Sequence, residues 1–237
     1  MRLIVRTLSE LCITAGAVIL LFVAYVLLWT GVTAEAAGAR QIESLESRWV
    51  AREPVRPPTA PPASPAPAPP PSPAAPEPYR EGEPFAVMYV PRFGAGWHWP
   101  VLEGTATDTL KKGLGHYPGT ARPGEAGNFS VAGHRRTYGD PFRDFPRLRP
   151  GDAVILNDGT TWFTYRVVRP PYRTVPGDIG VIDPVPRPDR SGFTGPGRYL
   201  TLTTCDPEWG SSHRLIAWAR LAATQPVDRG RPAAFHS

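Results

Sequence analysis

The residue most able to do chemistry in this sequence is a single cysteine, Cys205, at the end of the run "TLTTC". Arg214 follows nine positions later, after the turn-rich stretch "DPEWGSSH", and the only other cysteine, Cys12, lies in an apolar N-terminal segment. A thiolate is a strong nucleophile, but an ordinary thiol has a pKa of about 8.5 and is mostly protonated at neutral pH. Cys205 therefore needs a partner that handles protons.

A histidine is the usual proton-handling partner of a catalytic thiol. Among the five histidines, His134 in "VAGHRRTYGDPF" is the best candidate, because the end of a β-type run can present a side chain at the rim of a sheet. His98 and His116 lie in loops rich in aromatic residues and prolines. His213 adjoins Arg214, which disfavours its imidazolium form, and His236 lies in the C-terminal tail.

Arg214 can supply a third function. Acyl transfer to a thiol places negative charge on the carbonyl oxygen, and a fixed donor aimed at that oxygen is often the largest contribution to catalysis. Arginine keeps its charge and presents its N–H groups in a rigid fork. If Cys205 ends one strand and Arg214 begins the next, the loop between them brings both residues to one rim.

Metal or cofactor chemistry is not expected. The sequence has no paired Cys/His spacing of the kind that binds zinc. Acidic residues near the candidate site are scattered among turns: Asp140, Asp144, Asp206 and Glu208. We therefore expect the reaction to use protein side chains alone.

Residues 11–30 predict a membrane anchor, because twenty positions without a charge are about the length needed to cross a bilayer core. The small residues of "TAEAAGA" imitate a signal-peptide cleavage site, but signal peptides have shorter apolar regions, so an uncleaved anchor is favoured. Arg2 and Arg6 precede the anchor, and no basic residue follows it before Arg40. The positive-inside rule then places residues 1–10 in the cytoplasm and the rest outside, as a single-pass protein of the cell membrane.

This topology separates the two cysteines. Cys12 lies in the anchor and Cys205 lies in the extracytoplasmic part, so they cannot form a disulfide within one chain. Structural cysteines outside the cytoplasm usually come in pairs. The lone Cys205 is therefore either a buried small apolar residue or a working thiol.

Residues 31–81 are expected to separate the anchor from a folded domain. The alanine-rich pattern at 34–52 is compatible with a short juxtamembrane helix, and 13 of the 25 residues from Pro54 to Pro78 are proline. A segment so poor in backbone donors and apolar side chains cannot form a packed core. We expect an extended, disordered stalk that carries the domain into the cell wall.

Residues 82–225 have the length and pattern of one all-β domain, followed by a flexible tail at 226–237. Short β-rich runs alternate with glycine- and proline-rich turns, and "NDGT" at 157–160 predicts a hairpin. The runs are "FAVMYV", "NFSVAGH", "DAVILN", "WFTYRVV", "GRYLTLTTC" and "RLIAWARL". "TLKKGLG" and "PFRDFPRL" are long enough for only one or two helical turns. The pattern favours a β-sandwich or a closed β-barrel with short helices.

The net charge of +5 resides in residues 82–237. Residues 1–81 carry seven basic and seven acidic side chains, which leaves 26 − 7 = 19 basic and 21 − 7 = 14 acidic ones in the rest. A basic domain outside the cytoplasm suits an anionic wall or membrane surface. No DNA- or RNA-binding motif occurs, so nucleic acid is not an expected partner.

The same residues resemble the sortase family of cysteine transpeptidases. The family signature is TLxTC with an upstream histidine and a downstream arginine, matched here by "TLTTC", "AGHRRTYGDPF" and Arg214. "LKKGLGHYPGT", "PGEAGNFSVAGH", "RPGD" and "LTTCDP" are most similar to the class E sortases of actinobacteria. The resemblance extends over roughly residues 87–221, although "FGAGWHWPVLEG" is more aromatic than the usual early strand region.

The resemblance implies a closed eight-stranded β-barrel in which Cys205 is the nucleophile, His134 the general acid and base, and Arg214 the group that holds substrate and oxyanion. It also implies substrate-binding roles for Thr204, beside the nucleophile, and for Tyr138, in the class E "TYG" motif linked to acceptance of alanine where other sortases take proline. The expected substrate is a secreted protein with a C-terminal LAxTG- or LPxTG-like sorting signal, cleaved after threonine. The expected acceptor is an amine of a peptidoglycan precursor, lipid II.

Three other functions are compatible with parts of the pattern. A pilin-polymerising sortase would carry the same catalytic residues, although nothing here resembles an appended lid segment. A papain-like wall peptidase usually has its cysteine before its histidine, the reverse of the order of His134 and Cys205. A non-enzymatic wall-binding module with a free thiol would not need His134, Cys205 and Arg214 together.

Overall fold

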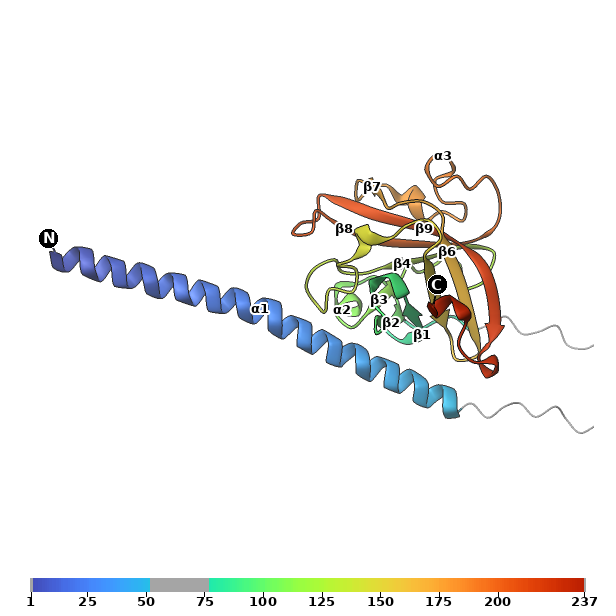
Figure 1. The fold of residues 1–237 in the computed structure, drawn as a ribbon, viewed down its shortest axis with the longest axis horizontal. Helices are drawn as coiled ribbons and strands as arrows, with labels where there is room; N and C mark the ends of the chain where they lie inside the picture. Colours follow the sequence, from blue (N-terminus) through green and yellow to red (C-terminus); the bar gives the residue numbers. More distant parts are fainter. Residues whose placement is uncertain (1, 52–76, 237) are drawn as a thin grey trace, which may run out of the picture.

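The chain forms a long N-terminal helix and a β-barrel that lies beside the second half of this helix (Figure 1). The computed structural model describes residues 2–51 and 77–236. The segment expected to form a proline-rich stalk falls mostly between these two ranges, so most of it lies outside the described residues.

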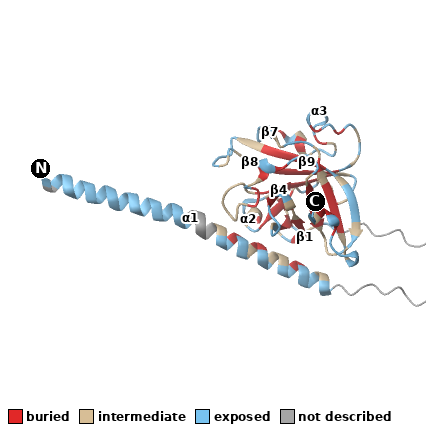
Figure 2. Cartoon of the chain, viewed as in Figure 1, coloured by how far each residue is buried: buried red, intermediate tan, exposed pale blue. Residues whose placement is uncertain are grey.

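Helix α1 (Arg2–Ala51) runs without a break and has two different halves. Its window Ile4–Tyr25 is apolar and long enough to cross a membrane, and none of it is buried. The anchor predicted at 11–30 overlaps this window. Further along the helix, Ala34 and Leu45 are only 2% and 3% exposed, because this half packs on the barrel (Figure 2).

The described part of the remaining chain contains nine strands and several short helices. The strands are β1 (Pro84–Tyr89), β2 (His98–Glu103), β3 (Leu114–His116), β4 (Gly127–Ala132), β5 (Ala153–Asn157), β6 (Thr161–Val167), β7 (Tyr172–Thr174), β8 (Arg198–Asp206) and β9 (His213–Pro226). The helices are α2 (Thr107–Leu110), α3 (Pro188–Ser191) and the 3-10 turns η1 (Pro91–Phe93), η2 (Phe145–Arg147), η3 (Ile179–Ile182), η4 (Val227–Arg229) and η5 (Ala233–His236).

Eight of these strands close into a barrel in the order β6-β5-β1-β2-β3-β4-β8-β9, and β9 pairs back with β6. Strand β9 is 14 residues long, so the edge that faces away from β8 can pair with two strands. Residues 219–226 pair with β6, and residues 214–216 pair with the short ninth strand β7. The predicted all-β fold, a closed eight-stranded barrel with short helices, is confirmed.

The barrel interior is filled by apolar side chains that alternate along each strand with residues of the outer face. On β8, Leu200 and Leu202 belong to the interior cluster, whereas Tyr199 belongs to a second cluster with Trp218 on the outer face. This second cluster also includes side chains from the connection between β7 and β8. The outer face of β8 is therefore covered at one end, and it becomes partly exposed at the end that carries Cys205.

Local sequence signals explain most of these elements. Each of the six expected β-runs overlaps a strand, and "NDGT" forms the β5–β6 hairpin, where Oδ1 of Asp158 accepts from the backbone N–H of Thr160 at 2.8 Å. Gly159 in this turn has a φ of +90°, which favours glycine. The turn η2 lies within "PFRDFPRL" as expected, whereas α2 covers only the start of "TLKKGLG", whose last two residues begin β3. The pattern does not reveal β2, which contains Pro100, or β3 and β7, which have three residues each.

A buried amide that fastens the β7–β8 connection to the sheet gives a test of stability. Asn128 on β4 is 1% exposed; its Nδ2 donates to the carbonyl of Asp183 at 3.0 Å, and its Oδ1 accepts from Oγ1 of Thr201 at 2.8 Å. Asn128→Ala removes both hydrogen bonds of this buried amide, so we expect the free energy of unfolding to fall by about 1–3 kcal/mol. Urea unfolding of the full chain in detergent, followed by tryptophan fluorescence, measures the change. An unaltered midpoint would show that the amide does not stabilise the fold.

Candidate active site

Three neighbouring strands bring the predicted catalytic residues to one level of the barrel. Cys205 on β8 pairs directly with Arg214 on β9. Strand β4 runs parallel to β8, and the N–H of Gly133, just after β4, donates to the carbonyl of Thr203 at 3.1 Å. His134 is the next residue, so it leaves β4 at the level where Cys205 lies on β8.

Cys205 and Arg214 lie on the outer face of the sheet. Leu202 and Leu215 belong to the interior cluster, and side chains alternate along a strand, so Cys205 and Arg214 point outward. Cys205, His134 and Arg214 are each partly exposed. The thiol is therefore not sealed in the core, and a substrate can approach this rim.

The backbone of His134 is held by the loop that follows it, because the N–H of Phe142 donates to the carbonyl of His134 at 2.9 Å. Nε2 of His134 is buried and has no hydrogen-bond partner among the described residues, so it is not bonded to Cys205. Burial lowers the pKa of His134 below its ordinary value, while Asp140 raises it and Lys111 lowers it by smaller amounts. At neutral pH the imidazole is therefore mostly uncharged.

The guanidinium of Arg214 is hydrogen-bonded through one nitrogen only. Nη1 donates to the carbonyl oxygens of Ser211 and His213, both at 2.9 Å. Within the described part of the chain, these are the hydrogen bonds that this side chain makes. Nε and Nη2 are therefore available to bind an anionic oxygen of a substrate on Cys205.

An ion pair ties the loop after His134 to the strand end after Cys205. Arg135 pairs with Oδ1 of Asp206, and Nε of Arg173 donates to Oδ2 of the same carboxylate at 2.6 Å. Burial by itself would raise the pKa of Asp206, but the hydrogen bonds from Arg173 and Arg135 outweigh this effect and lower it. The carboxylate therefore stays ionised at neutral pH and holds both arginines.

A second contact joins the same two loops farther from the sheet. Arg136 pairs with Glu208, and its guanidinium lies 5.0 Å from the ring centroid of Trp209, which is 62% exposed. A search of the sequence for catalytic residue types misses Arg135 and Arg136. Their signal in the sequence is the charge pattern of "HRRT" and "CDPE", which places basic residues after the histidine and acidic residues after the cysteine.

Thr204 lies on the opposite face of β8 from Cys205. It is 2% exposed, and its Oγ1 donates to the carbonyl of Gly133 at 2.8 Å. This hydrogen bond fixes the backbone that precedes His134 against the strand that carries the thiol. A direct contact of Thr204 with substrate stays a prediction.

Tyr138 lies beside the predicted base. Its ring centroid is 5.1 Å from that of His134, with an interplanar angle of 37°, and Nζ of Lys111 lies 5.8 Å from the Tyr138 centroid. Four consecutive residues of this loop have positive φ: Thr137 (71°), Tyr138 (51°), Gly139 (80°) and Asp140 (51°). Non-glycine residues rarely adopt this conformation, least of all threonine, so neighbouring structure must hold the loop in place.

The other histidines occupy different settings. His116 is 2% exposed, and its Nδ1 lies 2.5 Å from Oε2 of Glu103, so it belongs to the core. Nδ1 of His213 lies 2.9 Å from Nη2 of Arg173, and because arginine can only donate, this nitrogen accepts. Neither residue follows β4 as His134 does. Within residues 2–51 and 77–236, no group of three or more His, Cys, Asp or Glu side chains could hold a metal ion.

The charges around His134 give a test by titration. Asp140→Asn removes a carboxylate that raises the pKa of His134, so we expect that pKa to fall further; asparagine also tolerates the left-handed backbone at this position. Lys111→Gln removes a cation that lowers the pKa, so we expect a rise. NMR titration of the full chain labelled with ¹³C-histidine measures both shifts, and His134→Gln identifies the resonance. Identical pKa values in the three proteins would contradict this electrostatic coupling.

Comparison with known proteins identifies the family. A family model described as a sortase domain matches residues 88–222. Sortase SrtE1 of Streptomyces coelicolor is 36% identical over 239 residues, which cover 98% of this chain and 61% of that protein, so the chain spans about three fifths of its length. Sortase SrtE2 of the same organism is 32% identical over 233 residues, which cover 96% of this chain and 85% of that protein.

Solved structures agree with these sequence relatives. Sortase E from Streptomyces avermitilis is 66% identical and superimposes with a TM-score of 0.62, covering 66% of this chain and 99% of that chain. Sortase E1 from Streptomyces coelicolor, solved with a tripeptide in the active site, is 39% identical with a TM-score of 0.60, covering 65% of this chain and 96% of that chain. The barrel, the matching family model and these relatives together show that the chain belongs to the sortase family, whose members are cysteine transpeptidases.

Proposed function

We propose that this chain is a membrane-anchored cysteine transpeptidase that attaches secreted proteins to peptidoglycan. The observation that carries the proposal is the strand register that brings Cys205, His134 and Arg214 to one partly exposed rim. Membership of the sortase family supports the same reaction. The apolar window Ile4–Tyr25 is compatible with a single-pass anchor, with a cytoplasmic N-terminus and the barrel outside the cell.

The first half-reaction breaks the peptide bond after the threonine of the sorting signal. The Cys205 thiolate attacks the carbonyl carbon, and Arg214 stabilises the negative charge that develops on the oxygen. The C–N bond then breaks, the departing amine takes a proton from the imidazolium of His134, and a thioester remains on Cys205. Sulfur, imidazole and guanidinium thus act on three different atoms of the same peptide bond.

The second half-reaction transfers the acyl group to an amine of lipid II. The amine nitrogen attacks the thioester carbon and loses a proton to neutral His134, and the C–S bond breaks to release the thiolate. Burial lowers the pKa of His134, which makes its imidazolium a stronger acid but also a scarcer one. The reactive pair of thiolate and imidazolium therefore forms in a minority of molecules, and turnover is slow.

The proposed substrate is a protein with a C-terminal LAxTG- or LPxTG-like signal. We assign to Tyr138 the choice between alanine and proline in this signal, because "TYG" resembles the class E motif linked to that choice; its ring lies beside His134. We assign to Thr204 the spacing of His134 from Cys205 through its bond to Gly133. The tripeptide in the active site of Streptomyces coelicolor sortase E1 supports a peptide as the class of ligand.

Peptide ligation by the full chain in detergent tests this function. LAxTG and LPxTG peptides are incubated with diaminopimelate or oligoglycine, and products are identified by mass spectrometry. We expect ligated product from the wild type and none from Cys205→Ala, because no other group supplies the thioester. Cys12→Ala is the matched control and should keep full activity, because Cys12 lies in the apolar half of α1.

Two results of this experiment would redirect the proposal. Ligation only to a lysine-containing pilin peptide would favour the pilin-polymerising alternative. An enzymatic function would be contradicted if no amine is ligated and a thiol-directed peptidyl inhibitor does not label Cys205.

Tyr138→Phe tests substrate choice separately from the chemistry. The variant keeps the ring against His134 and removes only the hydroxyl group. We expect kcat/KM for the LAxTG peptide to fall by about 2- to 10-fold, the value of one hydrogen bond, while the LPxTG peptide is unaffected. An equal loss on both peptides would assign Tyr138 to the support of His134 instead.

A further inference from the structure

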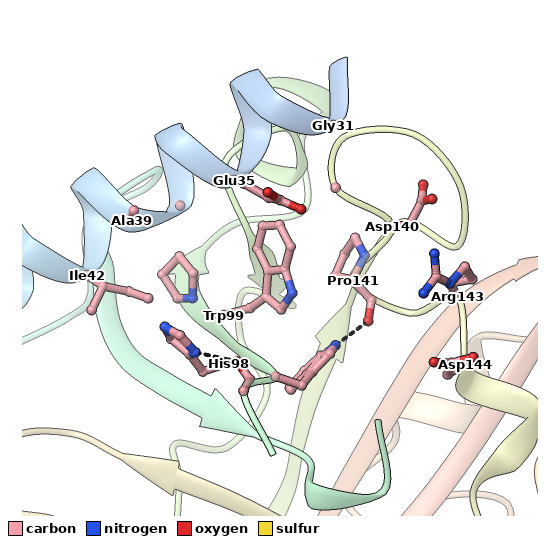
Figure 3. A pocket seen from close by; sticks show the side chains of 15 residues that line it. Gly31, Glu35, Ala39, Ile42, His98, Trp99, Asp140, Pro141, Arg143 and Asp144 are labelled. Carbon is pink, nitrogen blue, oxygen red and sulfur yellow. Dashed lines mark hydrogen bonds between the residues drawn. The ribbon is translucent and has the colours of Figure 1, made fainter. Parts of the chain in front are cut away.

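Trp99 of β2 connects the anchor helix to the loop of the candidate active site. Its indole is 8% exposed and lies between α1 and the loop that contains Asp140 and Pro141 (Figure 3). A Cβ at Gly38 of α1 would lie 3.2 Å from Cζ3 of Trp99, and a Cβ at Gly139 of the loop would overlap Cη2. Both backbones therefore lie directly against the ring. A side chain would have little room at Gly38 and none at Gly139.

The helix and the loop face each other across a cleft of about 470 Å³, whose lining includes Glu35 from α1 and Asp140 from the loop (Figure 3). Residues of β2 and of the segment before it form part of the same cleft. In addition to the packing of Trp99, Nε1 of Trp97 donates to the carbonyl of Pro141 at 2.9 Å. The two tryptophans thus hold the loop by packing and by a hydrogen bond.

The loop requires such support because its backbone is strained. Residues 137–140 have consecutive positive φ angles, and three of them are not glycine. Such conformations persist only where surrounding contacts over-determine them. Because Tyr138 packs on His134, the position of this loop also sets how far the imidazole of His134 is buried.

Helix α1 is fixed to the barrel at several further points. Leu45 is 3% exposed, and Nη2 of Arg48 donates to the carbonyl of Pro84 at 2.7 Å. Trp49 covers Gly159, where a Cβ would overlap the indole ring. The second half of α1 is therefore docked over several turns and can press on Trp99 as a rigid element.

We propose that the second half of α1 is a positioning element of the active site: it supports Trp99 against Gly139 and thereby holds the loop 137–140 against His134. The proposal rests on the proposed function, because the loop affects catalysis only if His134 is the acid and base. Trp99 is a positioning residue and touches no reacting atom. Because α1 is continuous from its apolar window to Ala51, the same contact links the active site to the membrane anchor.

A large side chain at Gly38 tests this link in the full chain. Gly38→Leu inserts its side chain between α1 and Trp99, whereas Ala36→Leu places the same side chain on the exposed side of the same helix. Leucine favours a helix more than glycine does, so loss of helix would not explain a defect. We expect Gly38→Leu to lower kcat/KM for the sorting peptide by about 10- to 100-fold, and Ala36→Leu to leave it unchanged.

Two measurements report on the loop without requiring catalysis. Tryptic sites flank loop 137–140 at Arg135, Arg136 and Arg143, and we expect faster cleavage there in Gly38→Leu. NMR titration should show the pKa of His134 closer to its ordinary value, because a loosened loop admits water to the imidazole. Trp99→Phe should also speed this cleavage, because the smaller ring loses its contact with Gly139.

The outcomes separate this inference from the proposed function. Unchanged cleavage and an unchanged pKa of His134 in Gly38→Leu would overturn it, as would a defect shared by Ala36→Leu or an unchanged rate of cleavage in Trp99→Phe. If the wild type forms no ligated product, the proposed function fails. The rate of tryptic cleavage and the pKa of His134 then still show whether α1 holds loop 137–140.

Discussion

The parallel pairing of β4 with β8 is the constraint on which the site depends. Parallel strands end at the same rim of a sheet, so the residue that leaves β4 meets the end of β8. The antiparallel return of β9 then places Arg214 opposite Cys205. A shift of β8 by one residue would turn Cys205 into the barrel and expose Thr204 instead. Burial of Leu200 and Leu202 in the interior therefore enforces the one register in which the thiol faces outward.

The candidate site combines a rigid frame with unsatisfied polar groups on the residues predicted to react. Asp206 is held by two arginines, and Thr204 is bonded to the backbone beside His134, so the frame cannot move freely. In contrast, Nε2 of His134 has no partner among the described residues, and Arg214 is bonded through Nη1 alone. Polar groups left unpaired in a fixed frame are costly to the fold, but they are ready to bind the charges of a transition state.

The relation of the barrel to helix α1 follows from packing as well as from chain connectivity. The described chain stops at Ala51 and resumes at Glu77, and residues from both sides of this gap, including Trp49 and Tyr79, line one cleft on the barrel. The second half of α1 thus belongs to the domain physically, although the proline-rich segment separates the two in sequence. Because this half also covers Trp99, it adjoins the loop that carries Tyr138.

The sequence by itself determined the fold class and the six principal strands and indicated the candidate residues of the site, because β-periodicity, turn residues and a thiol outside the apolar segment are local signals. It also indicated a helix after the apolar segment, but no partner for that helix. Only the tertiary structure decided the strand order, the inward side of Thr204 and the docking of α1 on Trp99. No periodic pattern in the sequence indicates that Gly38 and Gly139 lie against the indole of Trp99. This contact depends on how three segments distant in the chain fit together in space.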